Sequence, residues 1–266
     1  MSKSVLMCPP TYFEIEYEIN PWMSKDNPVD PELALQQWQA IYDIYTKQFG
    51  WDVKKIEPQQ NLPDMVFTAN GGLVIDGKVA LPTFRAPDRQ AETEHFNNWF
   101  YANGLQDFLE PKYDFEGEGD ALVWNDLIFA GYPWRSDLAS HSEIASFFDR
   151  EVISLQLADA RFYHLDTCLS IIDGDTVALW PEAFSVEALA KIHQTVPNVI
   201  EASEHDALAY GLNMPSDGTQ VVVSEGAPDL ANRLIELGKT VVTTSISEFQ
   251  KSGGGIKCLT LELRAS

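Results

Sequence analysis

A lone cysteine near the C-terminus is the residue best suited to do chemistry. Cys258 follows three consecutive glycines, residues 253–255, and glycine lets a ligand or another backbone approach closely because it has no Cβ. Residues 259–263 then alternate apolar and polar side chains, which is typical of a half-buried strand. A cysteine at the start of that strand, beside an open space, is a candidate nucleophile. The competing interpretation is a small buried hydrophobic side chain.

A histidine and an aspartate form a second candidate group. His164 and Asp166 are two residues apart, so they share one face of an extended segment. A histidine that accompanies a cysteine and carboxylates is a candidate general acid and base, whereas a lone histidine is more often a satisfied core or surface residue. We predict surface positions for the remaining histidines, which are His95, His141, His193 and His205.

The segment 115–120 is rich in acids and interleaved with glycine. Glu116, Glu118 and Asp120 fall within five positions, a density that could bind a metal ion. Loops for hard metals carry more ligands at regular spacing, so we expect no metal here. The alternative is a cradle for an organic cation, because a planar guanidinium pairs with carboxylates through two parallel hydrogen bonds.

The elements that would position these residues recur with a period of about 50 residues, the range of propellers and arrays. Each of five units has two short strands around a tight turn, then a helix, then another short strand. We predict the helices at residues 30–49, 89–103, 136–148, 185–195 and 228–237. We predict the strand pairs at residues 65–83, 121–132, 167–180, 210–223 and, with the N-terminal strand as partner, 258–263. One unit cannot bury its own faces, so the five should close around a shared axis as a single α/β domain of residues 1–266.

Polar residues recur at the starts of the predicted first strands. In chain order they are Asp64 with Asn70, Glu116 and Glu118 with Asp120, His164 with Asp166, Asn213, and Cys258. Units arranged around an axis would bring these strand starts to one point. That convergence favours the nucleophile interpretation of Cys258 over the hydrophobic one.

Net charge, hydropathy and cysteine count limit the kinds of partner and the cellular compartment that we expect for this chain. The chain has 266 residues and a formal net charge of −22, which disfavours nucleic acid and anionic membranes and permits a cationic small molecule. No stretch approaches the roughly 18 apolar residues of a membrane span, and the first residues lack the features of a signal peptide. Three widely spaced cysteines favour a reducing, cytoplasmic compartment over a disulfide framework or a zinc site. We expect no cofactor, and a homodimer stays open.

Four segments together resemble the guanidine-modifying superfamily, which includes arginine deiminase, dimethylarginine dimethylaminohydrolase, glycine amidinotransferase and cyanobacterial arginine dihydrolase. They are residues 63–70 (PDMVFTAN), 115–120 (FEGEGD), 162–167 (FYHLDT) and 253–260 (GGGIKCLT). The resemblance spans nearly the whole chain. It implies the pentein fold, a five-bladed α/β propeller, in agreement with the five units of the sequence.

The resemblance also implies roles for individual residues. Cys258 matches the nucleophile and His164 the general acid and base. The catalytic glutamate is matched by Glu116 or Glu118, and we prefer Glu116, although related enzymes often place this acid three residues before the aspartate, where this chain has Gly117. Asp166 matches the second guanidinium-binding acid of deiminases and amidinotransferases.

The remaining matches concern the substrate. Asn70 stands where deiminases carry aspartate, and together with Asn20 it is similar to arginine dihydrolase. Arg135, with Arg85 or Arg89, resembles the arginines that hold the substrate carboxylate. We also assign Asp64 and Glu118 to substrate binding.

The implied activity is hydrolysis of a guanidinium C–N bond through a covalent amidino-thioether, with arginine dihydrolase as the leading prediction. The alternatives are dimethylarginine dimethylaminohydrolase or arginine deiminase, then an amidinotransferase or a non-catalytic pentein scaffold.

Overall fold

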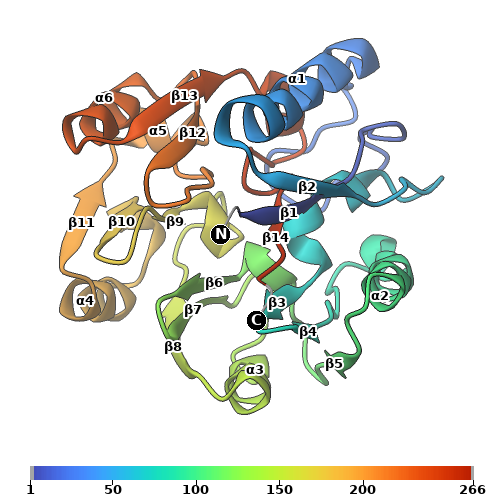
Figure 1. The fold of residues 1–266 in the computed structure, drawn as a ribbon, viewed down its shortest axis with the longest axis horizontal. Helices are drawn as coiled ribbons and strands as arrows, with labels where there is room; N and C mark the ends of the chain where they lie inside the picture. Colours follow the sequence, from blue (N-terminus) through green and yellow to red (C-terminus); the bar gives the residue numbers. More distant parts are fainter. Residues whose placement is uncertain (1–2, 265–266) are drawn as a thin grey trace.

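Five small sheets surround a common centre, and the longer helices lie on the outside of the ring (Figure 1). The structure is a computed structural model, and it describes residues 3–264. Strands from the two ends of the chain share one sheet: β14 (Leu261–Glu262) pairs antiparallel with β1 (Ser4–Met7), which pairs in parallel with β2 (Asp52–Lys55). The first and last parts of the sequence thus complete the ring together.

The other sheets repeat one plan. An antiparallel hairpin is followed by a helix and then by a third strand that joins the sheet in parallel, as a crossover connection allows. Three sheets complete this plan: β3 (Leu73–Ile75), β4 (Lys78–Ala80) and β5 (Asp107–Leu109); β6 (Ala121–Trp124), β7 (Leu127–Tyr132) and β8 (Glu151–Gln156); β9 (Leu169–Ile171), β10 (Thr176–Leu179) and β11 (Asn198–Glu201). The fifth sheet contains β12 (Gln220–Ser224) and β13 (Thr240–Thr244), which are parallel. The predicted unit of strand, turn, strand, helix and strand is therefore confirmed in these three sheets.

The five predicted helices are present, with a later start for α3 (Ser140–Phe148), and two short helices, α5 (Glu204–Leu208) and α7 (Ser247–Gln250), are additional. The other α-helices are α1 (Pro31–Asp43), α2 (Glu92–Ala102), α4 (Val186–Thr195) and α6 (Pro228–Glu236). Asp30 caps α1 as predicted, since its side chain accepts hydrogen bonds from two main-chain N–H groups, and a π-helical turn, Ile44–Phe49, continues that helix to Gly50. By contrast, α3 begins four residues after the predicted Ser136, because the Ser136 hydroxyl binds other groups.

Two predictions about strands are wrong. The segment 210–223 does not form two strands, because before β12 it makes only an isolated bridge between Ser216 and Val221. Cys258 does not start a strand either: β14 begins at Leu261, and the chain before it turns, with Thr260 N–H donating to the Lys257 carbonyl at 2.9 Å. Several other candidate residues lie in, or directly beside, short helical turns that precede strands, such as Gly117–Gly119 and Leu165–Thr167.

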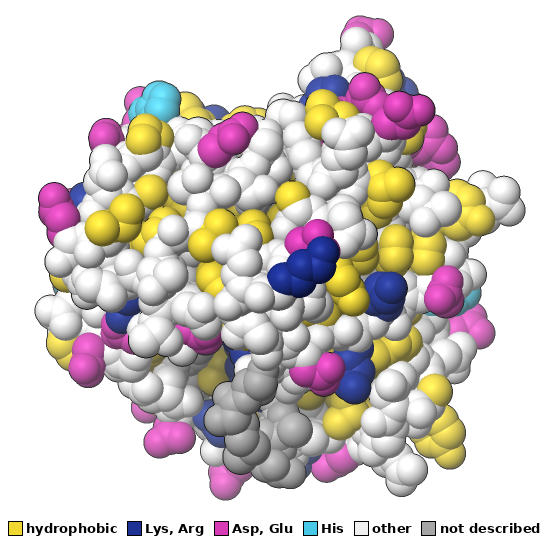
Figure 2. Space-filling view, turned by 45° about the horizontal axis from the view of Figure 1, so that its top comes forward, with side chains coloured by type: hydrophobic (Ala, Val, Ile, Leu, Met, Phe, Trp, Pro, Cys, Tyr) yellow, Lys and Arg dark blue, Asp and Glu magenta, His cyan; other side chains and the backbone are white. Residues whose placement is uncertain are grey.

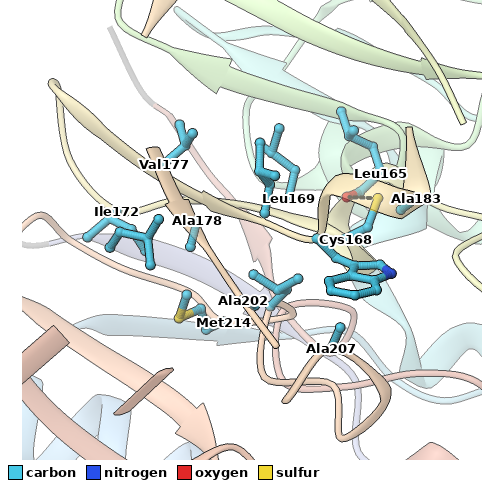
Figure 3. Packing of buried hydrophobic residues seen from close by; sticks show 14 of the residues in the cluster. Leu165, Cys168, Leu169, Ile172, Val177, Ala178, Ala183, Ala202, Ala207 and Met214 are labelled. Atoms are coloured by element: carbon cyan, nitrogen blue, oxygen red, sulfur yellow. Dashed lines mark hydrogen bonds between the residues drawn. The ribbon is translucent and has the colours of Figure 1, made fainter. Parts of the chain in front are cut away.

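Apolar side chains fill the spaces beneath and between the sheets. Figure 3 shows one such cluster, in which Cys168 lies among Leu165, Leu169 and Ala183. The Cys168 thiol donates to the Leu165 carbonyl at 3.5 Å, and burial raises its pKa well above that of an ordinary thiol. This cysteine therefore serves as a small hydrophobic side chain.

The surface carries most of the negative charge. On the face drawn in Figure 2, acidic side chains are scattered around the rim, and side chains of both signs lie near the middle. This dispersal is expected of a solvated acidic surface. Within residues 3–264, none of the helices combines the length and the apolar character that crossing a bilayer requires.

Candidate active site

The glycine run before Cys258 allows tight packing of the turn against two other segments. A Cβ at Gly254 would overlap the ring of Phe67, and a Cβ at Gly255 would lie 2.6 Å from Asn213 Oδ1. Both distances are too short for a real Cβ contact. The close approach expected at these glycines is therefore made by side chains of the protein itself, and it fixes the path of the chain up to Cys258.

The thiol of Cys258 faces the carboxylate of Asp166. Cys258 Sγ donates to Asp166 Oδ2 across 3.4 Å, and both residues are buried. The second carboxylate oxygen, Asp166 Oδ1, is buried without a hydrogen-bond partner among the described residues. Burial raises the pKa of Asp166 to about 7, against the opposing effect of Lys257. Burial and then the Asp166 charge raise the pKa of Cys258 well above its usual value, so the free protein holds this thiol protonated.

His164 is bonded to Glu116 within the same buried region. Its Nε2 lies 2.8 Å from Glu116 Oε2, which also accepts a hydrogen bond of 3.0 Å from Arg135 Nη1. Burial alone would raise the pKa of Glu116, but the Arg135 guanidinium and His164 more than offset it, and the pKa lies well below that of an ordinary glutamate. Glu116 is therefore an ionised carboxylate that orients the imidazole.

Glu118 points away from His164. Its carboxylate accepts from Lys257 Nζ at 2.6 Å and from the main-chain N–H of Glu262 at 2.9 Å, and it also pairs with Arg264. These contacts tie the acid-rich segment to the C-terminal strand. Of the two candidate glutamates, the structure brings only Glu116 into contact with the histidine.

Arg89 and Arg85 occupy different environments. Arg89 is 2% exposed and donates to both carboxylate oxygens of Glu92 at 2.8 Å and to Asn70 Oδ1 at 2.9 Å. Its Nε lies 3.9 Å from Asp64, whose Oδ1 is a second buried oxygen without a hydrogen-bond partner in the described part of the chain. Arg85 is more exposed and pairs with Asp114 at 2.7 Å. Arg89 thus adjoins the buried acids, and Arg85 lies at their rim.

A segment from the N-terminal part of the chain covers the site. Arg135 stacks over the ring of Tyr163 at 4.7 Å and donates to the Ile19 carbonyl at 3.1 Å. Asn20 Nδ2 donates to the Tyr163 hydroxyl at 3.3 Å and to the Ser252 carbonyl at 3.1 Å. Asn20 therefore links this cover to the glycine run that leads to Cys258.

Ser136 and Asp120 join two of the turns, and sequence reasoning missed this role. Ser136 Oγ donates to Asp120 Oδ2 at 2.7 Å and accepts from the main-chain N–H of Glu116 at 3.0 Å. Asp120 Oδ1 accepts from the main-chain N–H of Leu165 at 3.2 Å. Burial raises the pKa of Asp120 to about 6. The sequence placed Asp120 in the acid-rich segment, but Ser136 carried only the signal of a helix start.

The predicted surface position of His141 is wrong. His141 is buried in α3 and its Nδ1 lies 2.7 Å from Ser154 Oγ of β8, because this face of the helix packs on the sheet. Burial lowers its pKa to about 4. His193 and His205 are exposed as predicted, and His95 is half-buried.

An open cleft lies on another side of the Glu118 partners Lys257 and Arg264 and does not reach the thiol or the imidazole. It has a volume of about 660 Å³ and is lined by residues that include Lys3, Trp51, Lys257 and Arg264, but by neither Cys258 nor His164. Among residues 3–264, no group of three or more His, Cys, Asp or Glu side chains is arranged to hold a metal ion. The residues that could do chemistry are therefore buried and form two contacts, Cys258 with Asp166 and His164 with Glu116.

The ring of five small sheets is that of a pentein. The family model for eukaryotic N,N dimethylarginine dimethylhydrolase matches residues 9–265. The chain belongs to the dimethylarginine dimethylaminohydrolase family. It is 39% identical over 257 residues to N(G),N(G)-dimethylarginine dimethylaminohydrolase of Mycobacterium tuberculosis, covering 97% of this chain and 84% of that protein.

Arginine dihydrolases are similar to the same extent. The chain is 38% identical over 264 residues to the bifunctional arginine dihydrolase/ornithine cyclodeaminase AgrE of Nostoc sp., covering 97% of this chain and 37% of that longer protein. The crystal structure of the product-bound N-terminal domain of the cyanobacterial arginine dihydrolase ArgZ superposes with a TM-score of 0.94 at 37% identity, covering 100% of this chain and 98% of that one. The predicted superfamily, the pentein fold and the enzyme class, a hydrolase of C–N bonds in linear amidines, are confirmed.

Proposed function

We propose that this hydrolase acts on the guanidinium group of arginine through Cys258, as an arginine dihydrolase that forms ornithine, ammonia and carbon dioxide. The observation that carries the proposal is Asp166 Oδ1, a buried carboxylate oxygen that lies beside the thiol and has no hydrogen-bond partner in the described part of the chain. A buried carboxylate is costly unless a cation and hydrogen-bond donors compensate it. A guanidinium supplies both, and it would place its central carbon next to Cys258 Sγ.

The other charges of the site suit the rest of an arginine molecule. Arginine carries an ammonium and a carboxylate besides its guanidinium. Asp64 Oδ1 is another buried carboxylate oxygen without a hydrogen-bond partner among residues 3–264, and an ammonium would satisfy it. Arg135 is buried over Tyr163, and Arg89 is buried beside Asn70, so we propose these two, rather than the more exposed Arg85, to hold the carboxylate.

Substrate binding would itself activate the nucleophile. In the free protein, burial and the Asp166 charge raise the pKa of Cys258. A guanidinium bound to Asp166 brings a positive charge close to the sulfur, and a positive charge stabilises the thiolate and lowers the thiol pKa. The thiolate then attacks the guanidinium carbon, and much of the rate comes from holding the two atoms in place.

His164 would transfer the protons. It protonates the departing nitrogen, so ammonia leaves and an amidino-thioether remains on Cys258. The imidazole then takes a proton from a water molecule, which attacks the same carbon and releases citrulline and the thiolate. Glu116, bonded to His164 Nε2 at 2.8 Å, holds the ring in position.

A second round would complete the reaction. Asn70 is neutral, which permits a ureido group to bind again without an opposing charge. Attack by Cys258 expels a second ammonia, water then releases a carbamate, and the carbamate loses carbon dioxide to leave ornithine. In sum, one arginine and two water molecules give one ornithine, two ammonia and one carbon dioxide.

We also propose that residues 1–266 act as one catalytic domain in a reducing, cytoplasmic compartment. The pairing of β1 with β14 within one sheet supports a single domain. The three cysteines are unpaired, which suits a reducing compartment.

Product analysis tests the proposed function. Purified enzyme is incubated with arginine and, separately, with asymmetric dimethylarginine, and the amino acids and amines are quantified. We expect ornithine from arginine, with citrulline only as a transient, and no product from Cys258→Ser. Accumulation of citrulline without ornithine would contradict the dihydrolase assignment. Release of dimethylamine would instead favour the activity named for the Mycobacterium tuberculosis relative, which is 39% identical.

Substitution of Glu116 and of Glu118 should affect kcat and stability to different degrees. Glu116→Gln removes the carboxylate that orients His164, so we expect kcat per folded molecule to fall by about 10²–10³-fold. Some stability is lost as well, because Arg135 loses a buried partner. Glu118→Gln breaks a buried charge network with Lys257 and Arg264, so we expect a loss of about 3 kcal/mol of stability and a much smaller loss of kcat per folded molecule. Denaturant unfolding and steady-state kinetics on both variants check this. The opposite pattern would assign the catalytic role to Glu118.

A further inference from the structure

We infer that Asn213 is a positioning residue that fixes the distance between the nucleophile and Asp166, an inference that rests on the proposed function. Asn213 is fully buried and lies before β12, outside the segments that carry the thiol and the acid. Its Oδ1 accepts a hydrogen bond of 3.0 Å from the main-chain N–H of Cys258. Its Nδ2 donates a hydrogen bond of 2.9 Å to the main-chain carbonyl of Asp166. One amide therefore joins the backbones of the two facing residues.

The contact that this amide spans is the one on which the chemistry depends. Cys258 and Asp166 are 92 positions apart in the chain, and their side chains meet at 3.4 Å. A guanidinium held by the carboxylate reaches the sulfur in a reactive geometry only if that spacing is kept, and a displacement of about 1 Å can cost about 100-fold in rate. A planar carboxamide is suited to the task because it offers an acceptor and a donor at a fixed separation.

Asn213 is itself held on both sides. Its main-chain carbonyl accepts from the N–H of Lys257 at 3.1 Å. The hydroxyl of Ser170, in β9, donates to the carbonyl of Leu212 and, at 3.1 Å, to that of Met214. The amide is therefore mounted on a turn that is anchored to a neighbouring sheet.

The glycine at position 255 fits the same role. A Cβ there would lie 2.6 Å from Asn213 Oδ1 and 3.0 Å from Asn213 Cβ. Position 255 is therefore glycine where the Asn213 side chain packs against the turn that carries Cys258. Asn213 and the turn that contains Gly255 and Cys258 are distant in the sequence and fit closely together in the fold.

Three variants test the inference. Asn213→Ala removes both side-chain hydrogen bonds, and Asn213→Asp keeps the shape and the acceptor but loses the donor to Asp166. Asn198→Ala is the matched control, because that exposed amide also donates to a carbonyl, Asp175 O, at 3.3 Å. We measure kcat, KM, thermal unfolding, and the rate at which iodoacetamide alkylates Cys258 without substrate.

We expect Asn213→Ala to lower kcat by about 100-fold with KM within about threefold of wild type, and Asn213→Asp to lower kcat by a similar factor. Both should alter the alkylation rate of Cys258, and Asn198→Ala should alter neither quantity. A role in folding alone would lower the unfolding temperature and leave kcat per folded molecule unchanged, and that result overturns the inference. If Asn213→Ala does not fold, Asn213→Asp decides by the same criteria.

The two proposals fail separately. If the wild type converts no arginine, the proposed function is wrong, and the alkylation rates of the three variants still decide whether Asn213 positions Cys258. If the wild type converts arginine and both Asn213 variants match it in kcat and in alkylation, the proposed function stands and the positioning role is wrong.

Discussion

Replacing Cys258 by serine is expected to lower kcat for arginine by at least about 10⁴-fold while the variant folds and still binds arginine. The hydroxyl is a far weaker nucleophile than a thiolate, and removal of a covalent nucleophile costs factors of this size or larger. The groups that we propose to hold the substrate, Asp166 and Arg135, are unchanged in this variant. Steady-state kinetics and calorimetric titration with arginine measure the two quantities.

Cys168→Ala is the matched control for the loss of a thiol. Cys168 is fully buried in an apolar cluster and donates only to main-chain carbonyls. We expect its replacement to cost about 1 kcal/mol of stability and to leave kcat unchanged. A Cys258→Ser enzyme with more than about one hundredth of the wild-type rate, or an inactive Cys168→Ala enzyme that folds, would place the nucleophile elsewhere.

Replacing Asp166 by asparagine is expected to have opposite effects on catalysis and on thiol reactivity. The guanidinium loses its carboxylate partner, so kcat/KM for arginine should fall by about 10³-fold, the factor for a broken buried ion pair. The thiol loses a neighbouring negative charge that raises its pKa, so the pKa of Cys258 falls and more thiolate is present at neutral pH. Iodoacetamide should therefore alkylate the variant faster than the wild type in the absence of substrate.

The pH dependence of alkylation shows whether the pKa of Cys258 falls or rises in Asp166→Asn. The alkylation rate of each enzyme is followed against pH, and the midpoint for Asp166→Asn should lie below that of the wild type. Asp76→Asn is the control, since Asp76 pairs with Arg150 at an exposed hairpin turn, and its midpoint should not move. A midpoint that rises in Asp166→Asn would contradict the contact between the carboxylate and the thiol.

Local turn and cap chemistry explains why much of the fold is predictable from sequence. Asp76 and Asn125 take the left-handed conformation at hairpin turns, and these residue types adopt it most readily. Asp30 and Ser185 cap their helices with side-chain oxygens. Because such signals repeat about every 50 residues, the sequence predicts a ring of similar units. A ring in turn predicts that the polar turns of the units lie close together.

The directions of side chains within the turns could not be read in the same way. Glu116 and Glu118 look equivalent in sequence, but Gly117 between them has a φ of 58°, and a Cβ there would lie 2.7 Å from the Ala69 carbonyl oxygen. This left-handed residue sends the two carboxylates to different partners, His164 and Lys257. Alternation of residues along a strand says nothing about a turn of this kind.

Two further predictions, for Ser136 and His141, differ from the structure because of contacts between segments that are distant in the sequence. Ser136 reads as a helix start, but its hydroxyl binds Asp120 and the N–H of Glu116, partners that only the folded chain brings near. His141 reads as part of a polar helix, but that face of the helix covers β8. Neither contact leaves a signal in the residues next to it in the sequence.

The most direct test is the mass of the enzyme during turnover. Enzyme reacting with arginine is quenched in acid, digested, and analysed by mass spectrometry. A covalent mechanism predicts an added mass equal to arginine less ammonia, located on the peptide that contains Cys258 and absent from Cys258→Ser. Turnover of arginine without any adduct, or with the adduct on Cys8 or Cys168, would contradict a covalent reaction at Cys258.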